Sequence, residues 1–193
     1  MTIFTRGIEL STSITNVFIL IVSIIGYLLI KKDKLWNIFF LLMIFDSFLG
    51  VIVHGIVMSD KINTILWIIL SILFTITVNT LLCIFTKLNK KYILYLSLLL
   101  SIILLVQMKL NMNYLLTFTI YVILVVIISI YFIIKNNLEE KFYLLLGFII
   151  LIIGVILMLC KAKIGIINHN GICHLFLTIT LLLFIIGIRK RSH

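Results

Sequence analysis

The sequence contains no proline, and only 11% of its 193 residues are charged. Without proline, the helices lack the usual cause of a sharp kink. A soluble domain of this length does not need 64% hydrophobic residues, so a soluble globular class is excluded. The apolar runs do not alternate with polar residues, which excludes a membrane β-barrel. The composition therefore predicts an all-helical integral membrane protein.

Cysteine is also scarce, with Cys83, Cys160 and Cys173 alone. Three cysteines provide no disulfide framework, although Cys160 and Cys173 fall near the same predicted surface and one disulfide between them is conceivable. The first apolar run is too long for a cleavable signal peptide and is not followed by a small-residue cleavage site. The net charge of +10 comes from short basic clusters between apolar runs, without a nucleic-acid-binding motif, so we expect membrane lipids and no nucleic acid as partners.

Seven apolar runs are present, and most are long enough to cross about 30 Å of hydrocarbon. We expect one membrane domain over residues 1–193, a seven-helix bundle with spans at about 11–30, 35–58, 62–85, 92–108, 114–134, 142–160 and 172–188. The connections between these spans are too short to hold a soluble domain. The many Ile, Leu, Lys and Asn residues are typical of AT-rich bacterial DNA, so we expect a bacterial cytoplasmic membrane.

Basic residues are distributed unequally between the two sides of these spans. The side with the amino terminus and the even-numbered connections has five of the 16 lysines and arginines, and the other side has eleven. Positively charged loops stay in the cytoplasm. The count therefore predicts an amino terminus outside and a carboxyl terminus inside.

Three of the four histidines then fall at one membrane depth on the outer side: His54, His169 and His174. His193 is the last residue and carries no information. Imidazole is a common zinc ligand, and three histidines with a water make a catalytic zinc site. Because five residues separate His169 from His174, they would lie about 140° apart on a continuous helix. They can share a metal only if the last helix begins near Gly171. Alternatively, each histidine is a polar anchor at the membrane interface.

Other polar residues near this side have two interpretations each. Asp60 either steers a zinc-bound water or caps the third helix. Glu9 either caps the first helix or belongs to a polar group over the histidines. Ser47 shares a helix face with Gly50 and His54. Asp46 lies mid-span, where a carboxyl group needs a partner inside the bundle, such as Thr75 or Asn79 of the third span.

The sequence motifs "GVIVHG" and "NHNGICH" carry a resemblance. Seven spans with an outer histidine in the second and a late histidine pair resemble the CREST superfamily, which includes alkaline ceramidases and progestin and adiponectin receptors. A family of uncharacterised bacterial seven-span proteins is more similar, with "GxxxHG" and a late N-H-N-D-x-x-H. Gly171 stands where that family has an aspartate, and Asn16 stands where it has an acid in the first span.

The resemblance implies zinc held by three histidines, here His54, His169 and His174, and hydrolysis of a lipid amide or ester. Asp60 would steer the attacking water and Ser47 would donate to the oxyanion. Two other hypotheses remain open. The first is a non-catalytic seven-span sensor, scaffold or degenerate family member, which the two missing acids favour. The second is a small transporter that uses Asp46 and the histidines as an ion path.

Overall fold

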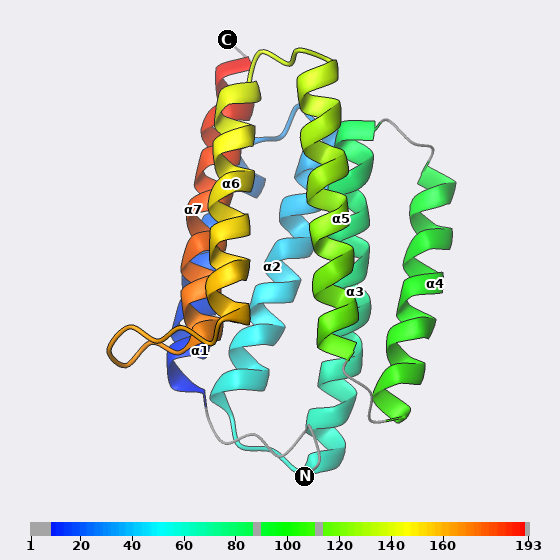
Figure 1. Ribbon diagram of the computed structural model, residues 1–193, viewed down its shortest axis with the longest axis vertical. Helices are drawn as coiled ribbons and strands as arrows, with labels where there is room; N and C mark the ends of the chain where they lie inside the picture. The colour runs from blue at the N-terminus through cyan, green and yellow to red at the C-terminus, as the bar shows by residue number, and fades with distance from the viewer. Residues whose placement is uncertain (1–8, 87–89, 111–113, 192–193) are drawn as a thin grey trace.

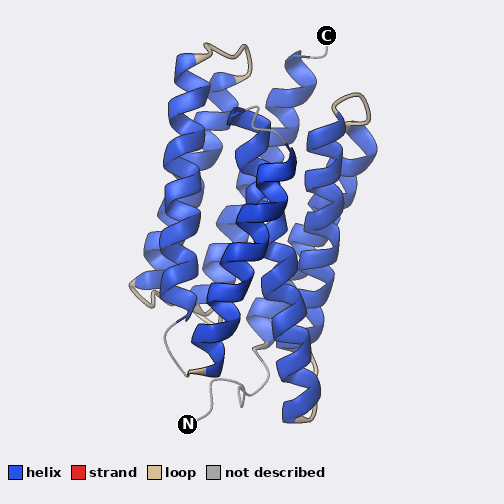
Figure 2. Ribbon diagram, turned by 90° about the vertical axis from the view of Figure 1, so that its right-hand side faces the viewer, coloured by secondary structure: helices blue, strands red, loops and turns tan. Residues whose placement is uncertain are grey.

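The computed structural model describes residues 9–86, 90–110 and 114–191, and these form seven α-helices joined by short connections (Figures 1 and 2). His193 lies outside the described residues. The helices are α1 (Leu10–Leu29), α2 (Lys34–Gly55), α3 (Asp60–Thr86), α4 (Lys90–Lys109), α5 (Tyr114–Lys135), α6 (Lys141–Leu159) and α7 (His169–Arg191). Most boundaries agree with the expected spans within a few residues. The all-helical expectation is confirmed.

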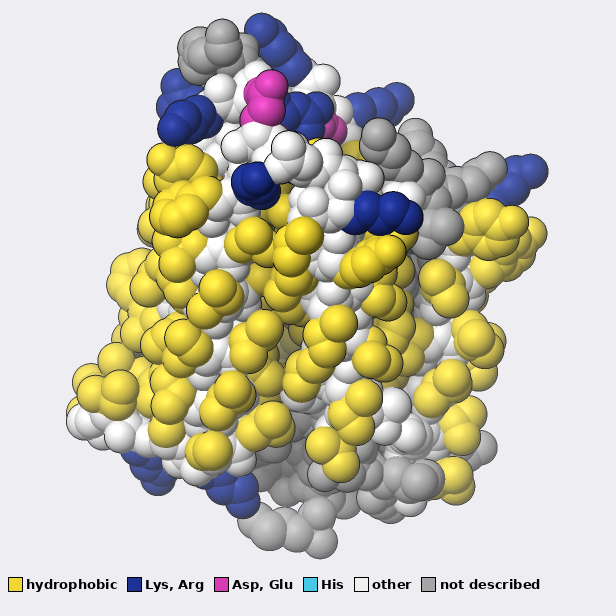
Figure 3. All heavy atoms as spheres, turned by 45° about the horizontal axis from the view of Figure 1, so that its top comes forward, with side chains coloured by type: hydrophobic (Ala, Val, Ile, Leu, Met, Phe, Trp, Pro, Cys, Tyr) yellow, Lys and Arg dark blue, Asp and Glu magenta, His cyan; other side chains and the backbone are white. Residues whose placement is uncertain are grey.

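Six helices are long and apolar enough to cross a membrane: α1, α2, α3, α5, α6 and α7. α4 contributes only a shorter apolar stretch, Tyr95–Gln107. In the face drawn in Figure 3, hydrophobic side chains cover the middle of the molecule, and lysines and arginines gather toward its two ends. This distribution matches a bilayer, whose apolar core lies between two polar headgroup layers.

Six helices form a closed ring in the order α1, α2, α3, α5, α6, α7, and α4 packs outside it against α3 and α5 (Figure 1). α1 packs closely along both of its neighbours, α2 and α7, whereas α5 and α6 make the least extensive contact in the ring. The ring therefore has a tightly packed side formed by α6, α7, α1 and α2. Its α5–α6 side is looser.

The carboxyl-terminal end of the ring is filled by aromatic side chains. Trp36 at the start of α2 lies 5.7 Å from Phe85 and 5.6 Å from Phe184, measured between ring centroids. Phe148 of α6 completes the cluster at 5.1 Å from Phe184. All four side chains are at most 3% exposed. This cluster fills one half of the ring and leaves the opposite half, where the amino terminus lies, for polar side chains.

α7 begins earlier than the span expected at 172–188. Asn168 precedes the helix, and its side-chain oxygen accepts a hydrogen bond from the backbone N–H of Gly171 at 2.8 Å. This is the N-cap interaction, in which a side chain replaces the missing partner of a first-turn N–H. Gly171 therefore lies inside the helix and does not break it. As a result, His169 and His174 belong to one continuous helix.

Candidate functional site

The histidines of α2 and α7 meet at the amino-terminal end of the ring, opposite the aromatic cluster. The rings of His54, one residue before the end of α2, and His174, in the second turn of α7, have centroids 6.2 Å apart. Trp67 of α3 packs edge-on against His54 with a centroid distance of 5.3 Å. Three helices therefore enclose the pair, and α1 covers it from the fourth side through Thr15.

Glu9 is the acidic partner of His54. Its carboxylate oxygen Oε2 lies 3.4 Å from Nδ1 of His54, and its backbone N–H donates to the carbonyl of His54 at 2.9 Å. The same Oε2 accepts hydrogen bonds from the amide of Asn170 at 3.1 Å and from the hydroxyl of Thr12 at 3.0 Å. Although Glu9 occupies the N-cap position of α1, its side chain makes no capping hydrogen bond. It joins the polar group over the histidines.

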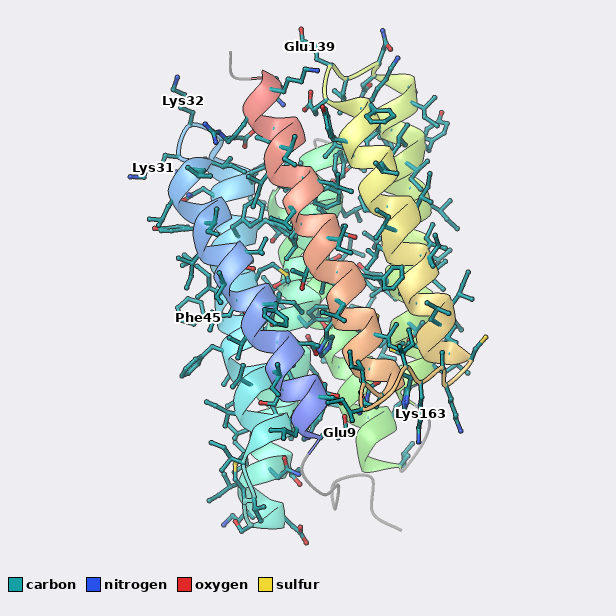
Figure 4. The ribbon with its side chains drawn as sticks, turned by 90° about the vertical axis from the view of Figure 1, so that its left-hand side faces the viewer. Glu9, Lys31, Lys32, Phe45, Glu139 and Lys163 are labelled. Carbon is teal, nitrogen blue, oxygen red and sulfur yellow. The ribbon has the colours of Figure 1, made fainter. Side chains whose placement is uncertain are left out.

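These contacts hold the pKa of Glu9 well below its ordinary range. The hydrogen bond with His54 is the largest cause, and the hydrogen bonds from Asn170 and Thr12 lower the pKa further, while partial burial opposes them. Glu9 is therefore a carboxylate at neutral pH, and it accepts a hydrogen bond from Nδ1 of His54. Figure 4 shows Glu9 at the start of α1, at the opposite end of the molecule from Lys31 and Lys32.

The hydrogen-bond partners assign a tautomer to both rings. A carboxylate only accepts hydrogen bonds, so Nδ1 of His54 carries a proton toward Glu9. The hydroxyl of Thr15 donates to backbone carbonyls of its own helix and lies 3.4 Å from Nδ1 of His174, so it accepts from that nitrogen. In the neutral rings, both Nε2 atoms then keep their lone pairs. A lone pair on Nε2 is the form of imidazole that binds a metal or accepts a proton.

His169 occupies a different position from the other two histidines. It is the first residue of α7, and the continuous helix turns it about 140° away from His174. Its Nδ1 is buried and has no hydrogen-bond partner among the described residues. Asn170, one helical turn before His174, shares the His174 face and contacts Glu9 instead.

The other two residues considered for catalysis, Ser47 and Asp60, lie in α2 and in the first turn of α3. Ser47 is two turns deeper in α2, about 10 Å along the helix from His54. Its hydroxyl donates to the Met43 carbonyl at 2.6 Å and is buried in that contact. Asp60 is exposed in the first turn of α3, where residue 59 precedes the helix, so Asp60 does not occupy the cap position.

Asp46 has a different partner from those expected. Its Oδ2 accepts a hydrogen bond from the hydroxyl of Thr77 at 2.6 Å, rather than from Thr75 or Asn79. Asn79 faces away from α2: its amide donates to Ser97 of α4 at 2.9 Å, and Tyr121 of α5 donates to its carbonyl oxygen. The Oδ1 atom of Asp46 is buried without a partner within the described ranges.

Two further expectations concern cysteine and metal. Cys83, Cys160 and Cys173 are all free thiols. In the described part of the chain, His, Cys, Asp and Glu side chains form no group of three arranged to hold a metal ion. His54 and His174 supply two nitrogen ligands of the right kind. A third ligand would require a movement of Glu9 or His169 toward them.

Comparison with known proteins places both histidine motifs in one family. No curated protein and no solved structure matches the chain significantly. A family of unknown function, DUF6962, matches residues 11–193 and so includes His54, His169 and His174. The match extends over nearly the whole chain, and the chain therefore belongs to the DUF6962 family.

Proposed function

We propose that this chain is a zinc-dependent hydrolase of a lipid amide or ester, with all seven helices spanning a bacterial cytoplasmic membrane. The amino terminus and the histidine pair face the outside. The orientation is supported by the distribution of lysine and arginine, eleven on one side and five on the other. The single observation that carries the chemistry is the meeting of His54 and His174, each with Nδ1 against an acceptor.

The arrangement of Glu9 and His54 supports a metal role. Zinc-binding histidines usually donate the second ring nitrogen to a carboxylate or carbonyl, which orients the ring and increases its basicity. Glu9 lies in that position for His54, and Thr15 lies in it for His174. Zinc bound between them would acidify a water toward neutral pH, so that it can attack a carbonyl group.

The third ligand is either His169, as the resemblance implies, or Glu9. His169 completes a three-histidine set but lies on another side of α7 from His174. Glu9 completes a two-histidine, one-glutamate set, which catalytic zinc sites also use. Glu9 would have to leave Nδ1 of His54 to serve as this ligand, because a zinc ion on Nε2 lies on another side of the imidazole ring.

The remaining roles follow from position. Asn170 and Thr12 hold the Glu9 carboxylate toward His54. The aromatic cluster closes the inner half of the ring, so water reaches the histidines from the outer end. Asp60, exposed in the first turn of α3, would steer the zinc-bound water, and Ser47 would have to release the Met43 carbonyl to donate to an oxyanion. A lipid would enter between α5 and α6, the most loosely packed neighbours of the ring.

The second candidate is a non-catalytic family member. Gly171 and Asn16 stand where the similar bacterial family has acids, and each takes part in a hydrogen bond that stabilises a helix. The backbone N–H of Gly171 is used by the Asn168 cap, and Asn16 donates to the Thr12 carbonyl at 3.1 Å beside Gly50. Such a protein would keep the hydrogen-bonded histidines as structure and bind no metal. Transport is less well supported, because Asp46 and Asn79 face different neighbours and form no continuous path.

A metal measurement on the full chain decides between these candidates. The protein is purified in detergent without a histidine tag, and zinc is measured by mass spectrometry beside His54→Ala and His174→Ala. Both variants should lose the zinc that the wild type holds. His169→Ala and Glu9→Gln are then compared: the variant that loses zinc identifies the third ligand. Absence of zinc from the wild type, even after zinc is added back, would overturn the hydrolase.

Hydrolysis is tested separately once zinc is found. The zinc-loaded protein is incubated with lipid amides and esters in mixed micelles, and fatty-acid release is measured. Activity should disappear in His54→Ala and after chelation. A zinc-loaded wild type that releases no fatty acid from either class would contradict the proposed reaction and favour the non-catalytic family member.

A further inference from the structure

The connection between α6 and α7 folds into a small hairpin, residues 160–167. Ile164 and Ile167 exchange two backbone hydrogen bonds, at 3.1 and 3.0 Å, as an antiparallel bridge. Gly165 at the turn has a φ of +57°, a left-handed conformation that glycine adopts without steric cost. In Figure 1 this hairpin projects sideways from the ends of α6 and α7, away from the other helices.

The tip of the hairpin is apolar and its base is positive. Ile166 is 94% exposed and Ile164 is 63% exposed. Lys161 and Lys163 are exposed next to them, and residues 160–167 include no acidic residue. Figure 4 shows Lys163 at the same end of the molecule as Glu9. Two exposed isoleucines on a structured turn have no packing role within the chain, so their environment must come from outside it.

The length of α6 places the hairpin at the level of the lipid headgroups. α6 has 19 residues, which give a helix of about 28 Å, close to the thickness of the hydrocarbon core. Its two ends therefore lie at the two borders of that core. A hairpin that leaves the end of α6 sideways stays at this border and extends over the neighbouring lipids. Lysines at such a border direct their charge to the phosphates while their stems stay apolar.

We propose that the hairpin of residues 160–167 binds the membrane surface and recognises anionic lipid headgroups. Ile164 and Ile166 enter the acyl-chain border, and Lys161 and Lys163 bind lipid phosphate groups. The two lysines favour an anionic surface, because no acidic residue in the hairpin neutralises their positive charge. This inference does not depend on the proposed hydrolase, since it uses no residue of the histidine group.

The binding has a structural consequence for the candidate site. The hairpin continues directly into Asn168, whose side chain caps α7 and lies 2.9 Å from the hydroxyl of Thr12. Its backbone N–H also contacts Ser11 at 3.4 Å. A headgroup held by the hairpin therefore lies beside the connection that positions Asn170 and Glu9. Anionic lipid should steady this end of α7 against α1.

The test places a fluorescent tryptophan reporter at residue 166, the tip of the hairpin. Ile166→Trp in the full chain is reconstituted into phosphatidylcholine vesicles that contain brominated acyl chains and increasing fractions of phosphatidylglycerol. Bromine quenches a tryptophan that enters the lipid, and the wild type provides the background from Trp36 and Trp67. Quenching of the reporter should rise with the anionic fraction. Lys161→Gln and Lys163→Gln are added to the reporter singly and together.

Each lysine removed should weaken the binding of the hairpin to an anionic surface about fivefold, so half-maximal quenching should need a higher anionic fraction. Lys31→Gln with Lys32→Gln in the reporter is the matched control, because it removes the same charge from exposed lysines at the other end and should change nothing. A reporter that is not quenched in any vesicle would show that the tip faces water or a protein partner. Quenching that is independent of both phosphatidylglycerol and the two lysines would overturn the recognition of anionic lipid.

Discussion

At the scale of single residues, Glu9 is the most informative side chain. From the sequence, an acid just before "STSITN" favours a helix cap, with a group over the histidines as the alternative. The structure places its carboxylate against His54 and two neighbouring hydrogen-bond donors, Asn170 and Thr12. Because Thr12, His54 and Asn170 belong to α1, α2 and α7, Glu9 connects three helices at the amino-terminal end of the ring. Its contribution should therefore be visible in stability as well as in any activity.

This connection predicts a pH-dependent stability. A carboxyl whose pKa is lower in the folded than in the unfolded chain stabilises the fold above its unfolded pKa, and the stabilisation is lost as the pH falls toward the folded pKa. Glu9→Gln should cost about 1 to 2 kcal/mol at neutral pH. The difference from the wild type should shrink below about pH 4, where an ordinary glutamate becomes protonated. Thermal unfolding in detergent over this pH range measures it.

Glu139→Gln is the control for Glu9, because Glu139 is an exposed carboxylate at the opposite end of the molecule. Its substitution should leave the unfolding temperature almost unchanged at every pH. A Glu9→Gln difference that stayed constant down to strongly acidic pH would show that the carboxylate charge is not what stabilises this end.

At the scale of helices, the tightly packed side of the ring depends on glycine at points of close approach. Gly154 of α6 lies against α7, where a Cβ atom would come 2.5 Å from Cβ of Phe176. Membrane helices lack a hydrophobic driving force between one another, so small residues that allow close packing carry much of their association. The α6–α7 pair also carries the hairpin and His174, so its packing sets the position of one half of the candidate site.

Gly154→Ala should therefore destabilise the protein by about 1 to 3 kcal/mol, because the added methyl group forces α6 and α7 apart. Ile153→Ala, at a neighbouring position that is 43% exposed, is the matched control and should have a much smaller effect. The unfolding temperature in detergent measures both. Equal unfolding temperatures for Gly154→Ala and the wild type would contradict the close approach.

At the scale of the whole molecule, the two ends differ in what joins the helices. At the carboxyl-terminal end, Arg191 forms ion pairs with Glu140 at 3.1 Å and with Asp33 at 3.8 Å, above the aromatic cluster. At the other end, among the described residues, Glu9 joins His54 of α2 and the amide of Asn170 of α7. The apolar ring joins these two polar ends, and its direction across the membrane decides which compartment the histidines face.

Orientation is tested through the exposed thiol of Cys160, which lies in the hairpin. A membrane-impermeant maleimide should label Cys160 on intact spheroplasts, because this connection is expected outside. Lys32→Cys in a Cys160→Ser background places a thiol at the opposite end, which should be labelled only after permeabilisation. Gel-shift counting of labelled protein measures both. Reversal of the two patterns would invert the predicted orientation and place the histidine pair in the cytoplasm.

The sequence predicted the helices well and the side-chain partners poorly. A run of about twenty apolar residues with polar ends is a local property, so the expected spans agree with the helices within a few residues in most cases. The start of α7 was missed because Asn168 reaches forward to cap the helix, so Gly171 does not end it. Thr77 was missed as the partner of Asp46 because the rotation of α3 about its axis is not a local property.

By itself, the sequence determined an all-helical membrane protein and the two motifs that carry His54 and His174, and it predicted a direction across the membrane from the positive charges. Only the tertiary structure decided that Glu9 joins these histidines, that His169 turns away from His174, and that the hairpin tip is exposed. The physical reason is the difference between local properties of one segment and contacts between segments that are far apart in the sequence. Hydrophobic runs and loop charges act through the bilayer on each segment separately, whereas hydrogen-bond partners depend on how α1, α2 and α7 rotate against one another.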